Sequence, residues 1–392
     1  MTYHLKLILC LATTLGTMAW VQTATSEEDS HAATSGSPVA YVYVSNTLKN
    51  GSVNEIEAYA AARDGKLTRV AGSPFQEDVT NMAVNGKYLF ATDSNGFEID
   101  AYTIESDGAL RYKTTTNASD SDDCNTLGPL FLDHTGATLY DMEFNGSGCA
   151  NNTYVSFAVD WPTGGLKDLG NSSGNRWLYL ASSFIGNNVY AYTASCLEDM
   201  YWGIYGFDRN NKGLLTEIAI GAKPPAPPSG DFYCPSQAAA DPTGHVAISM
   251  QAVNKDFNAA GAPRLATYTA NSKGQLSTAS KLSNMPETSV VNVTDLNMSP
   301  SGKLLAVGGT GGLQIFHFNG SSPITHYTGL LTKDEVDQFF WDEQNHLYAI
   351  SRTAGKLFVF TVTPTSYSRA PGSPYSINKP QNIIVQILPE RH

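Results

Sequence analysis

The chain has 392 residues, of which 42% are hydrophobic and 15% are charged. This length and composition allow a large buried core and exclude an intrinsically disordered protein. The formal net charge is −12 at pH 7, which argues against nucleic acid and anionic membranes as partners. Abundant Tyr, Thr, Val, Phe and Gly, without a long stretch of helical periodicity after the first two dozen residues, predict an all-β protein.

Residues 1–24 predict a secretory signal peptide. His4 and Lys6 give a positive start, and the apolar run from Leu7 to Leu15 is followed by small residues. The run is shorter than the ~20 residues that a membrane span requires, so we expect no span in the mature chain; a retained anchor is the alternative. The protein is therefore expected to be secreted or periplasmic. Residues 25–38 are small, polar and acidic, which predicts a disordered lead-in.

A unit of about 40 to 50 residues recurs along the rest of the chain, which is typical of a β-propeller. Its clearest copy predicts an inner strand at Asp295–Met298, a second strand at Lys303–Val307 and a third at Leu313–Phe318. The third strand shows an apolar-x-x-aromatic pattern that appears seven times, starting at Ile56, Ile99, Val155, Ile204, Leu265, Ile315 and Leu357. The sequence thus predicts a seven-bladed β-propeller over residues 39–388.

A turn of the form Asp/Ser-x-x-Gly/Asn joins the predicted inner and second strands. We expect a positive φ at the last residue of each turn, because Gly and Asn adopt that conformation readily. These turn-ending residues are Gly136, Gly244, Gly302 and Asn345. This turn pattern is lost around Asn175, where the inner strand of the fourth blade is expected.

The two ends of the predicted propeller complement each other. The first unit begins with a second-strand sequence, Ala40–Val44, and the chain ends with a spare strand, Asn382–Leu388. We expect the C-terminal strand to complete the first blade, because this closure removes an exposed sheet edge.

Four cysteines follow the predicted leader, and an even number in an exported chain predicts disulfides. Blade geometry favours Cys124 with Cys149 and Cys196 with Cys234, all within long loops on one face. No CxxC or His-rich spacing accompanies them, so a zinc site is not expected. We expect neither another metal nor a cofactor.

Two surfaces are candidates for binding. Aromatic residues of the long loops, including Trp202 and Tyr233, form either a wall for sugar or peptide or the packing of their own loops. At the mouth of the central channel, each inner strand should begin with a residue that points toward the axis. Counting back from the turns gives Pro129, Gln237, Asp295 and Gln338, and aligning the shorter units adds Asn81 and Asn382. Together they predict a polar ring, which suits a small polar ligand or a solvated pore.

Signals for catalysis are sparse. The histidines after the leader do not cluster, and no Ser-His-Asp arrangement can be assembled from them. Asp295 and Asp337 are the carboxylates that the predicted blades place near the channel mouth, where they could act in acid-base chemistry.

Four segments of the chain resemble the lactonase-type seven-bladed propellers, whose members include 6-phosphogluconolactonase of the cycloisomerase type and muconate cycloisomerase. The resemblance extends from Val39 to Leu388. The segments are YVYVSN from Tyr41, DGKL from Asp64, GSPF from Gly72 and DLNMSPSGKLLAV from Asp295.

The resemblance implies lactone hydrolysis by a histidine in a Pro-x-His segment, together with an arginine and an acid in the channel. The corresponding segment here, Cys234–Gln237, has no histidine. Asp295 matches the acid of the family. The family's arginine after the following strand is absent, and Arg352 of the last blade is the basic residue that could reach the mouth.

Two functions follow from these observations. The first is an exported, monomeric scaffold that binds a small polar ligand, a glycan or a protein through its loop face and channel mouth. The alternative is a divergent lactonase that acts on a sugar lactone, using Asp295 with Arg352 or Asp337 and a polarised water.

Overall fold

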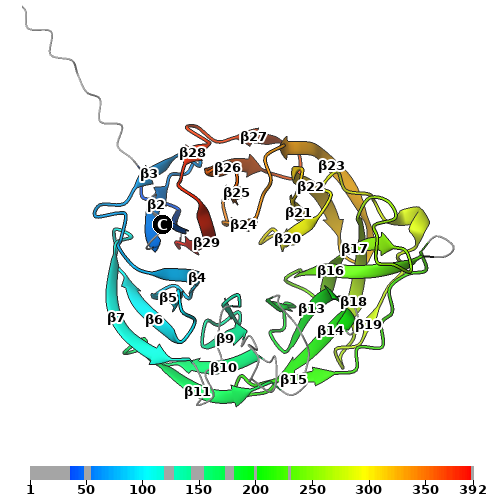
Figure 1. The fold of residues 1–392 in the computed structure, drawn as a ribbon, viewed down its shortest axis with the longest axis horizontal. Helices are drawn as coiled ribbons and strands as arrows, with labels where there is room; N and C mark the ends of the chain where they lie inside the picture. The colour runs from blue at the N-terminus through cyan, green and yellow to red at the C-terminus, as the bar shows by residue number, and fades with distance from the viewer. Residues whose placement is uncertain are drawn as a thin grey trace, which may run out of the picture. The chain divides into compact units, whose positions relative to one another are not determined.

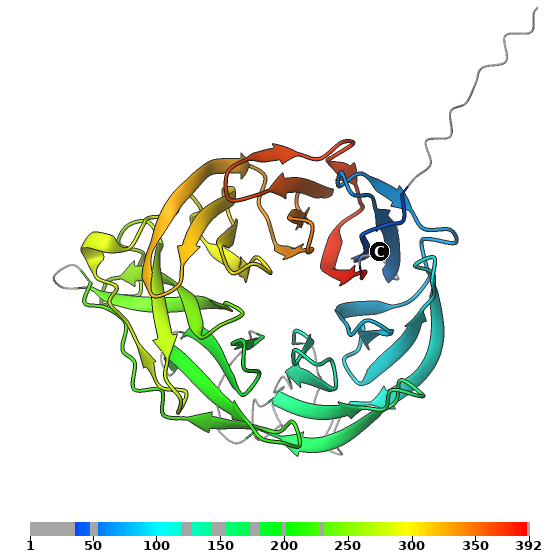
Figure 2. The same cartoon turned by 180° about the vertical axis from the view of Figure 1, so that it is seen from behind.

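Seven antiparallel sheets surround a central axis and form a β-propeller (Figure 1; Figure 2). The computed structural model describes residues 36–47, 54–118, 128–142, 154–172, 181–197, 201–227 and 231–389, without the side chains of Leu197, Tyr201 and Trp202. The predicted all-β, seven-bladed architecture is confirmed. None of the helices in these ranges has the length and apolar character needed to cross a membrane.

The blades are named in chain order, and each is given from its inner to its outer strand. Blade 1 contains β29 (Pro380–Ile387), β1 (Ala40–Thr47), β2 (Asn54–Ala61) and β3 (Leu67–Arg69). Blade 2 contains β4 (Val79–Val84), β5 (Tyr88–Asp93), β6 (Glu98–Ile104) and β7 (Leu110–Asn117). Blade 3 contains β8 (Phe131–Leu132), β9 (Thr138–Met142), β10 (Tyr154–Val159) and β11 (Leu166–Asn171). Blade 4 contains β12 (Ser183–Phe184), β13 (Tyr190–Leu197), β14 (Tyr201–Arg209) and β15 (Leu215–Ile218).

The remaining three blades follow the same order. Blade 5 contains β16 (Phe232–Ala240), β17 (His245–Val253), β18 (Arg264–Ala270) and β19 (Leu276–Ser277), followed by the short 3-10 helix η1 (Leu282–Asn284). Blade 6 contains β20 (Val293–Met298), β21 (Leu304–Gly309), β22 (Gly312–Asn319) and β23 (Ser322–Thr332). Blade 7 contains β24 (Gln338–Trp341), β25 (His346–Ser351), β26 (Lys356–Val362) and β27 (Tyr367–Arg369), and β28 (Tyr375–Ser376) also pairs with β26.

The C-terminal strand closes the ring as predicted. β29 is the inner strand of blade 1 and pairs antiparallel with β1, so that Tyr43 lies opposite Ile384. β29 also contacts the inner strands of both neighbouring blades, β24 and β4. Closure therefore joins the two ends of the propeller within one sheet.

The turns between inner and second strands differ from the prediction at one position. Gly136, Gly302 and Asn345 have positive φ angles of 67°, 66° and 63°. Gly244 is not among the positive-φ residues, so the prediction was wrong there. In that turn the Asp241 carboxylate accepts hydrogen bonds from the backbone N–H groups of residues 243 and 245, as the Asp342 carboxylate does from residues 344 and 346 in blade 7.

The inner strand of blade 4 lies later in the chain than the region around Asn175, which is outside the described residues. It is β12, and the turn after it ends at Asn188 with φ 58°. Only two residues of β12 pair with β13, so this strand carries no detectable hydrophobic period.

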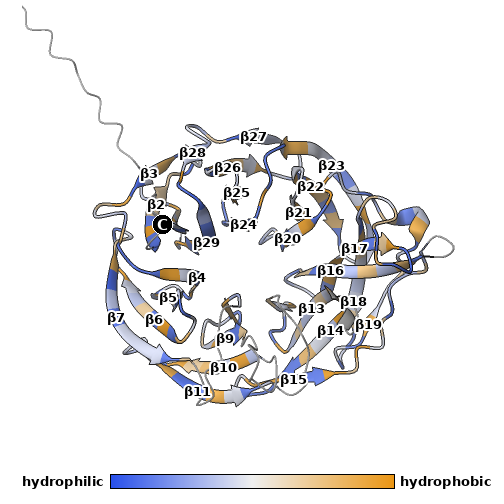
Figure 3. Ribbon diagram, in the orientation of Figure 1, coloured by the Kyte–Doolittle hydropathy of each residue, from blue (hydrophilic) through white to orange (hydrophobic). Residues whose placement is uncertain are grey.

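The core lies between the blades, so the central strands are buried on both faces. All six residues of β25 are buried, and hydrophobic residues occur in every blade (Figure 3). Tyrosines of the second strands also reach the outer turn of the next blade. Their hydroxyls donate to backbone carbonyls, from Tyr43 to Gly108 at 3.0 Å and from Tyr192 to Gly274 at 2.7 Å.

Candidate binding site at the channel mouth

The five polar residues of the predicted ring all lie in inner strands. They occur once in each of β4, β16, β20, β24 and β29, and they are Asn81, Gln237, Asp295, Gln338 and Asn382. Pro129 precedes β8 and is outside any strand. The counting rule therefore identified equivalent positions in different blades.

Each of three ring side chains accepts a hydrogen bond from the backbone of the next inner strand. Asp295 Oδ2 accepts from the N–H of Phe339 at 2.9 Å. Gln338 Oε1 accepts from the N–H of Ile383 at 2.9 Å and from Asn382 Nδ2 at 3.0 Å. Asn382 Oδ1 accepts from the N–H of Met82 at 3.1 Å. These bonds run in one direction from blade 6 through blades 7 and 1 to blade 2 and brace the inner wall of the channel.

Gln237 also bonds to the next inner strand, but as a hydrogen-bond donor and not as an acceptor. Its Nε2 donates to the carbonyl oxygen of Thr294 at 2.8 Å, next to Asp295 in β20. Gln237 stands at the position where the resemblance led us to look for a histidine. The amide thus links blade 5 to blade 6 and supplies no base.

Asp295 has the most unusual electrostatic environment of the ring. Burial of the carboxyl raises its pKa to about 7, while hydrogen bonds from the backbone N–H groups of Phe339 and Leu296 oppose this shift. Part of the residue remains accessible to solvent, although protein atoms crowd the carboxyl. At neutral pH this group can therefore either accept or donate a proton.

The other two candidate catalytic residues are engaged elsewhere. Asp337 Oδ2 accepts a hydrogen bond from the backbone N–H of Arg352 at 2.7 Å. The Arg352 guanidinium donates to the carbonyl oxygens of Pro380 and Gln381, both at 3.3 Å. Within the described ranges, no ion pair joins Arg352 to Asp295 or to Asp337. The structure therefore does not pair the raised-pKa carboxyl with an arginine.

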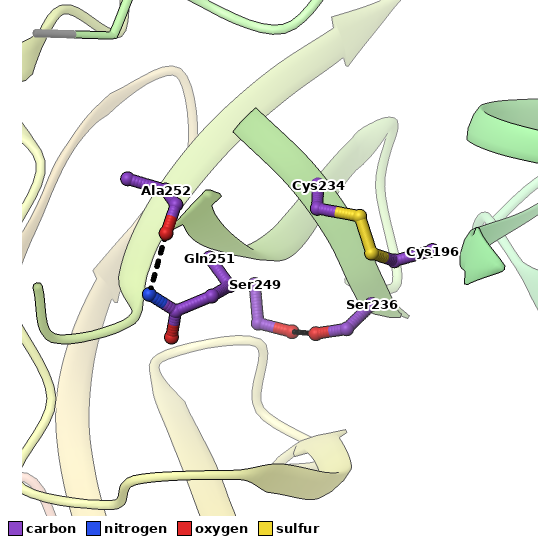
Figure 4. Close-up of a disulfide and its surroundings, with 6 residues drawn as sticks. All are labelled: Cys196, Cys234, Ser236, Ser249, Gln251 and Ala252. Carbon is purple, nitrogen blue, oxygen red and sulfur yellow. Dashed lines mark hydrogen bonds between the residues drawn. A yellow bond between two sulfur atoms is a disulfide. The ribbon is translucent and has the colours of Figure 1, made fainter. Parts of the chain in front are cut away.

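A disulfide fastens the neighbouring part of the ring. Cys196 of β13 and Cys234 of β16 are bonded, with their Cα atoms 5.1 Å apart (Figure 4). The predicted pairing is confirmed, but the expected loop location was wrong: both cysteines lie in strands, because the hairpins of blades 4 and 5 extend into the predicted loops. The bond joins two adjacent blades. Cys124 and Cys149 lie outside the described residues.

Polar side chains accompany this disulfide. The hydroxyls of Ser236 and Ser249 are 2.8 Å apart, and Gln251 Nε2 donates to the carbonyl of Ala252 at 2.9 Å (Figure 4). Ser249 is fully buried, so this pair stabilises the β16–β17 hairpin.

Of the two aromatic candidates for ligand binding on the loop face, the structure describes the side chain of Tyr233 but not that of Trp202. Tyr233 is 2% exposed, and its ring packs in the hydrophobic cluster between blades 4 and 5. Its hydroxyl is buried and has no hydrogen-bond partner among the residues that the structure describes. Trp202 belongs to β14, but its side chain is outside the described set. Phe232 and Phe257 pack edge to face with ring centroids 5.1 Å apart.

A buried polar cluster that the sequence pattern did not predict lies on the opposite face. Asp342 Oδ2 is 2.7 Å from His346 Nδ1 and accepts a hydrogen bond from the Tyr348 hydroxyl at 2.7 Å. All three residues are at most 1% exposed, so the cluster is structural. Asp241 and His245 repeat the Asp–His pair at 2.8 Å, and a histidine four residues after the turn Asp is the signal that could have revealed both.

The described residues hold no group of three or more His, Cys, Asp or Glu side chains with the geometry of a metal site. Among the described residues, the polar ring at the channel mouth therefore consists of four amides and one carboxyl group of raised pKa. This chemistry suits hydroxyl groups of a ligand better than it suits a metal ion or an anionic group.

No family model and no curated protein matches this sequence. Solved structures match its fold. A periplasmic gluconolactonase from Pseudomonas aeruginosa superposes with a TM-score of 0.62 and 14% identity, covering 89% of this chain and 99% of that one. A candidate 6-phosphogluconolactonase from Bacteroides fragilis gives a TM-score of 0.63 and 15% identity, with coverages of 90% and 99%. The protein therefore shares its seven-bladed β-propeller fold with these lactonase-type structures.

The same lactonase-like fold also matches a protein of different description. A hypothetical selenium-binding protein from Sulfolobus tokodaii has a TM-score of 0.59 at 11% identity, with coverages of 89% and 94%. At these identities the likeness shows the fold alone, since one fold hosts many activities. The function of this lactonase-like propeller must be argued from its own residues.

Proposed function

We propose that this lactonase-like propeller is an exported, monomeric binding protein that holds a small, uncharged, polyhydroxylated ligand at its channel mouth without turnover. The observation that supports the proposal is the braced polar ring. Because Gln237, Asp295, Gln338 and Asn382 are each hydrogen-bonded to the next blade, this part of the ring is preorganised and loses little entropy when a ligand binds. A few fixed polar groups around a concave opening are typical of small-molecule sites.

The ring offers both a hydrogen-bond donor and a hydrogen-bond acceptor to such a ligand. Gln237 uses its Nε2 and Gln338 its Oε1 to reach the neighbouring blades. Within the described part of the chain, no hydrogen bond occupies Gln237 Oε1 or Gln338 Nε2. An acceptor and a donor therefore flank Asp295, an arrangement that suits ligand hydroxyls.

Lactone hydrolysis is the second candidate, and the pKa of Asp295 favours it. A carboxyl group with a pKa near the working pH is an effective general base for activating a water molecule. The Pseudomonas and Bacteroides proteins of similar fold are also described as lactonases. Against this function stand the amide at position 237 and the engagement of the Arg352 guanidinium with backbone carbonyls.

A ligand screen with a linked activity assay separates the two functions. Thermal unfolding of the full chain is measured with sugar lactones, the corresponding acids and small glycans, and any stabilising lactone is then assayed for hydrolysis. Asp295→Asn is the test variant, and Glu343→Gln, an exposed carboxylate on the opposite face, is the matched control. Stabilisation without hydrolysis supports the binding protein. Hydrolysis that is lost only in Asp295→Asn supports the lactonase, and the absence of any small-molecule shift contradicts both.

A further inference from the structure

Two acidic residues are buried on one face of β2, away from the channel mouth. Glu55 is 8% exposed and Glu57 is 5% exposed. Side chains two residues apart in a strand point to the same face. This is the face directed at blade 7, because Tyr59, the next residue in the same register, packs in the cluster shared with that blade.

Glu57 has a positively charged partner. Arg69 of β3 forms an ion pair with Glu57 Oε2, and the Tyr59 hydroxyl donates to the same oxygen. The charge of Glu57 is therefore compensated locally, as buried charges require.

In the described part of the chain, the hydrogen bonds to Glu55 come from neutral groups. Asn46 Nδ2 donates to Glu55 Oε1 at 3.1 Å, and Gln76 Nε2 donates to Glu55 Oε2 at 2.8 Å. Over the described ranges Glu55 forms no ion pair. A carboxylate at this depth without an opposite charge is unfavourable, because amide donors do not replace the lost hydration of the charge.

Asn46 contributes an independent sign of a missing partner. The residue is fully buried, and among the described residues its Oδ1 has no hydrogen-bond partner. Nδ2 of the same amide group donates to Glu55 Oε1, so Oδ1 belongs to a side chain that contacts this carboxylate. Buried carbonyl oxygens without a protein donor are rare in folded proteins, and a bound water molecule or ion commonly satisfies them.

We propose that Glu55 and Asn46 bind a calcium ion at the outer part of the junction between blades 7 and 1. Carboxylate and amide oxygens are the ligands that this hard cation prefers, and water can complete its coordination shell. The ion would supply the charge that Glu55 lacks and a partner for Asn46 Oδ1. With a single charged ligand, the Kd should be on the order of 10⁻⁴ to 10⁻³ M, as in extracellular calcium modules.

Calcium titrations of the full chain test this site. The protein is treated with a chelator, and its thermal unfolding is followed as calcium chloride is added, with ionic strength held constant by sodium chloride. We expect the Tm to rise with calcium in the wild type and in Glu98→Gln, an exposed carboxylate of blade 2. Glu55→Gln should lose the shift. A wild type without a calcium-dependent shift, or a shift that persists in Glu55→Gln, would overturn the proposal.

A second variant separates ion binding from a purely structural role. Asn46→Asp replaces a donor to Glu55 with a second carboxylate, so the chelated variant should unfold at a lower Tm than the wild type. Calcium should then raise its Tm by more than it raises that of the wild type, because the site has gained a charged ligand. A variant that is destabilised equally with and without calcium would show that water alone satisfies this site.

Discussion

The carboxylate of Asp295 accepts a hydrogen bond from the backbone N–H of Phe339, 44 residues further along the chain and in the inner strand of the next blade. This bond places a carboxyl group with a pKa raised to about 7 within the wall that braces the channel. Asp295 is thus both a structural link between blades 6 and 7 and a ring residue whose pKa is raised by burial.

The pKa of Asp295 predicts a specific dependence of stability on pH. The folded pKa, about 7, is higher than the ordinary value of 3.8, so the native state binds more protons between these values. The contribution of Asp295 to the free energy of unfolding is therefore fully present below about pH 4 and is lost as pH rises through 7. We expect ionisation of Asp295 over this pH range to lower the free energy of unfolding by ~1–3 kcal/mol. Partial exposure of the residue makes this loss smaller than the whole pKa shift would give.

Urea unfolding at several pH values checks this prediction in wild type and Asp295→Asn. The difference between the two proteins isolates Asp295 from the other carboxylates, some of which shift in the opposite direction, as Asp241 does. Glu343→Gln should follow the wild type. Parallel curves for wild type and Asp295→Asn would show that the carboxyl titrates normally.

The number of blades and their closure could be predicted because the signals are local. Each third strand carries its own apolar and aromatic spacing, and the missing inner strand at one end matches the spare strand at the other. The inner strand of blade 4 could not be predicted, since two paired residues carry no period and the turn ends at Asn188 instead of a glycine.

The site was predictable only in part for a different physical reason. Counting from the turns gives the position of a ring residue, but the partner of its side chain depends on another blade. Asn382 and Met82, for example, are separated by 300 residues. The engagement of Arg352 with two carbonyls of β29 likewise depends on closure of the ring and leaves no mark in the local sequence.

Asn382→Ala should weaken the closure between blades 7, 1 and 2. The substitution leaves the buried N–H of Met82 without its acceptor and removes the donor to Gln338, which together should cost ~2–3 kcal/mol of unfolding free energy. The neighbouring Gln381→Ala removes one hydrogen bond to Thr47 at a more accessible position and should cost under ~1 kcal/mol. Urea unfolding measures both, and equal losses would contradict a special role of Asn382.

Loss of the disulfide between blades 4 and 5 should also destabilise the protein. The bond closes a separation of 38 residues, so Cys234→Ala should lower the free energy of unfolding by ~2–4 kcal/mol. A reductant should destabilise the wild type more than it destabilises the variant. Peptide mapping without reduction should find Cys196 linked to Cys234 and, as the sequence predicts, Cys124 linked to Cys149. A peptide that links Cys124 to Cys196 would refute both pairings.

Tyr192→Phe tests the tyrosine links between second strands and the outer turns. Tyr192 is fully buried, and its hydroxyl donates to the carbonyl of Gly274 in the next blade at 2.7 Å. Phenylalanine keeps the ring but leaves that carbonyl without its donor, so we expect a loss of ~1–2 kcal/mol in urea unfolding. Tyr112→Phe is the control, because Tyr112 is 55% exposed and bonds only within its own strand to Thr115. Its effect should stay within ~0.5 kcal/mol, and a similar loss in both variants would mean that the link between blades contributes nothing beyond an ordinary hydroxyl.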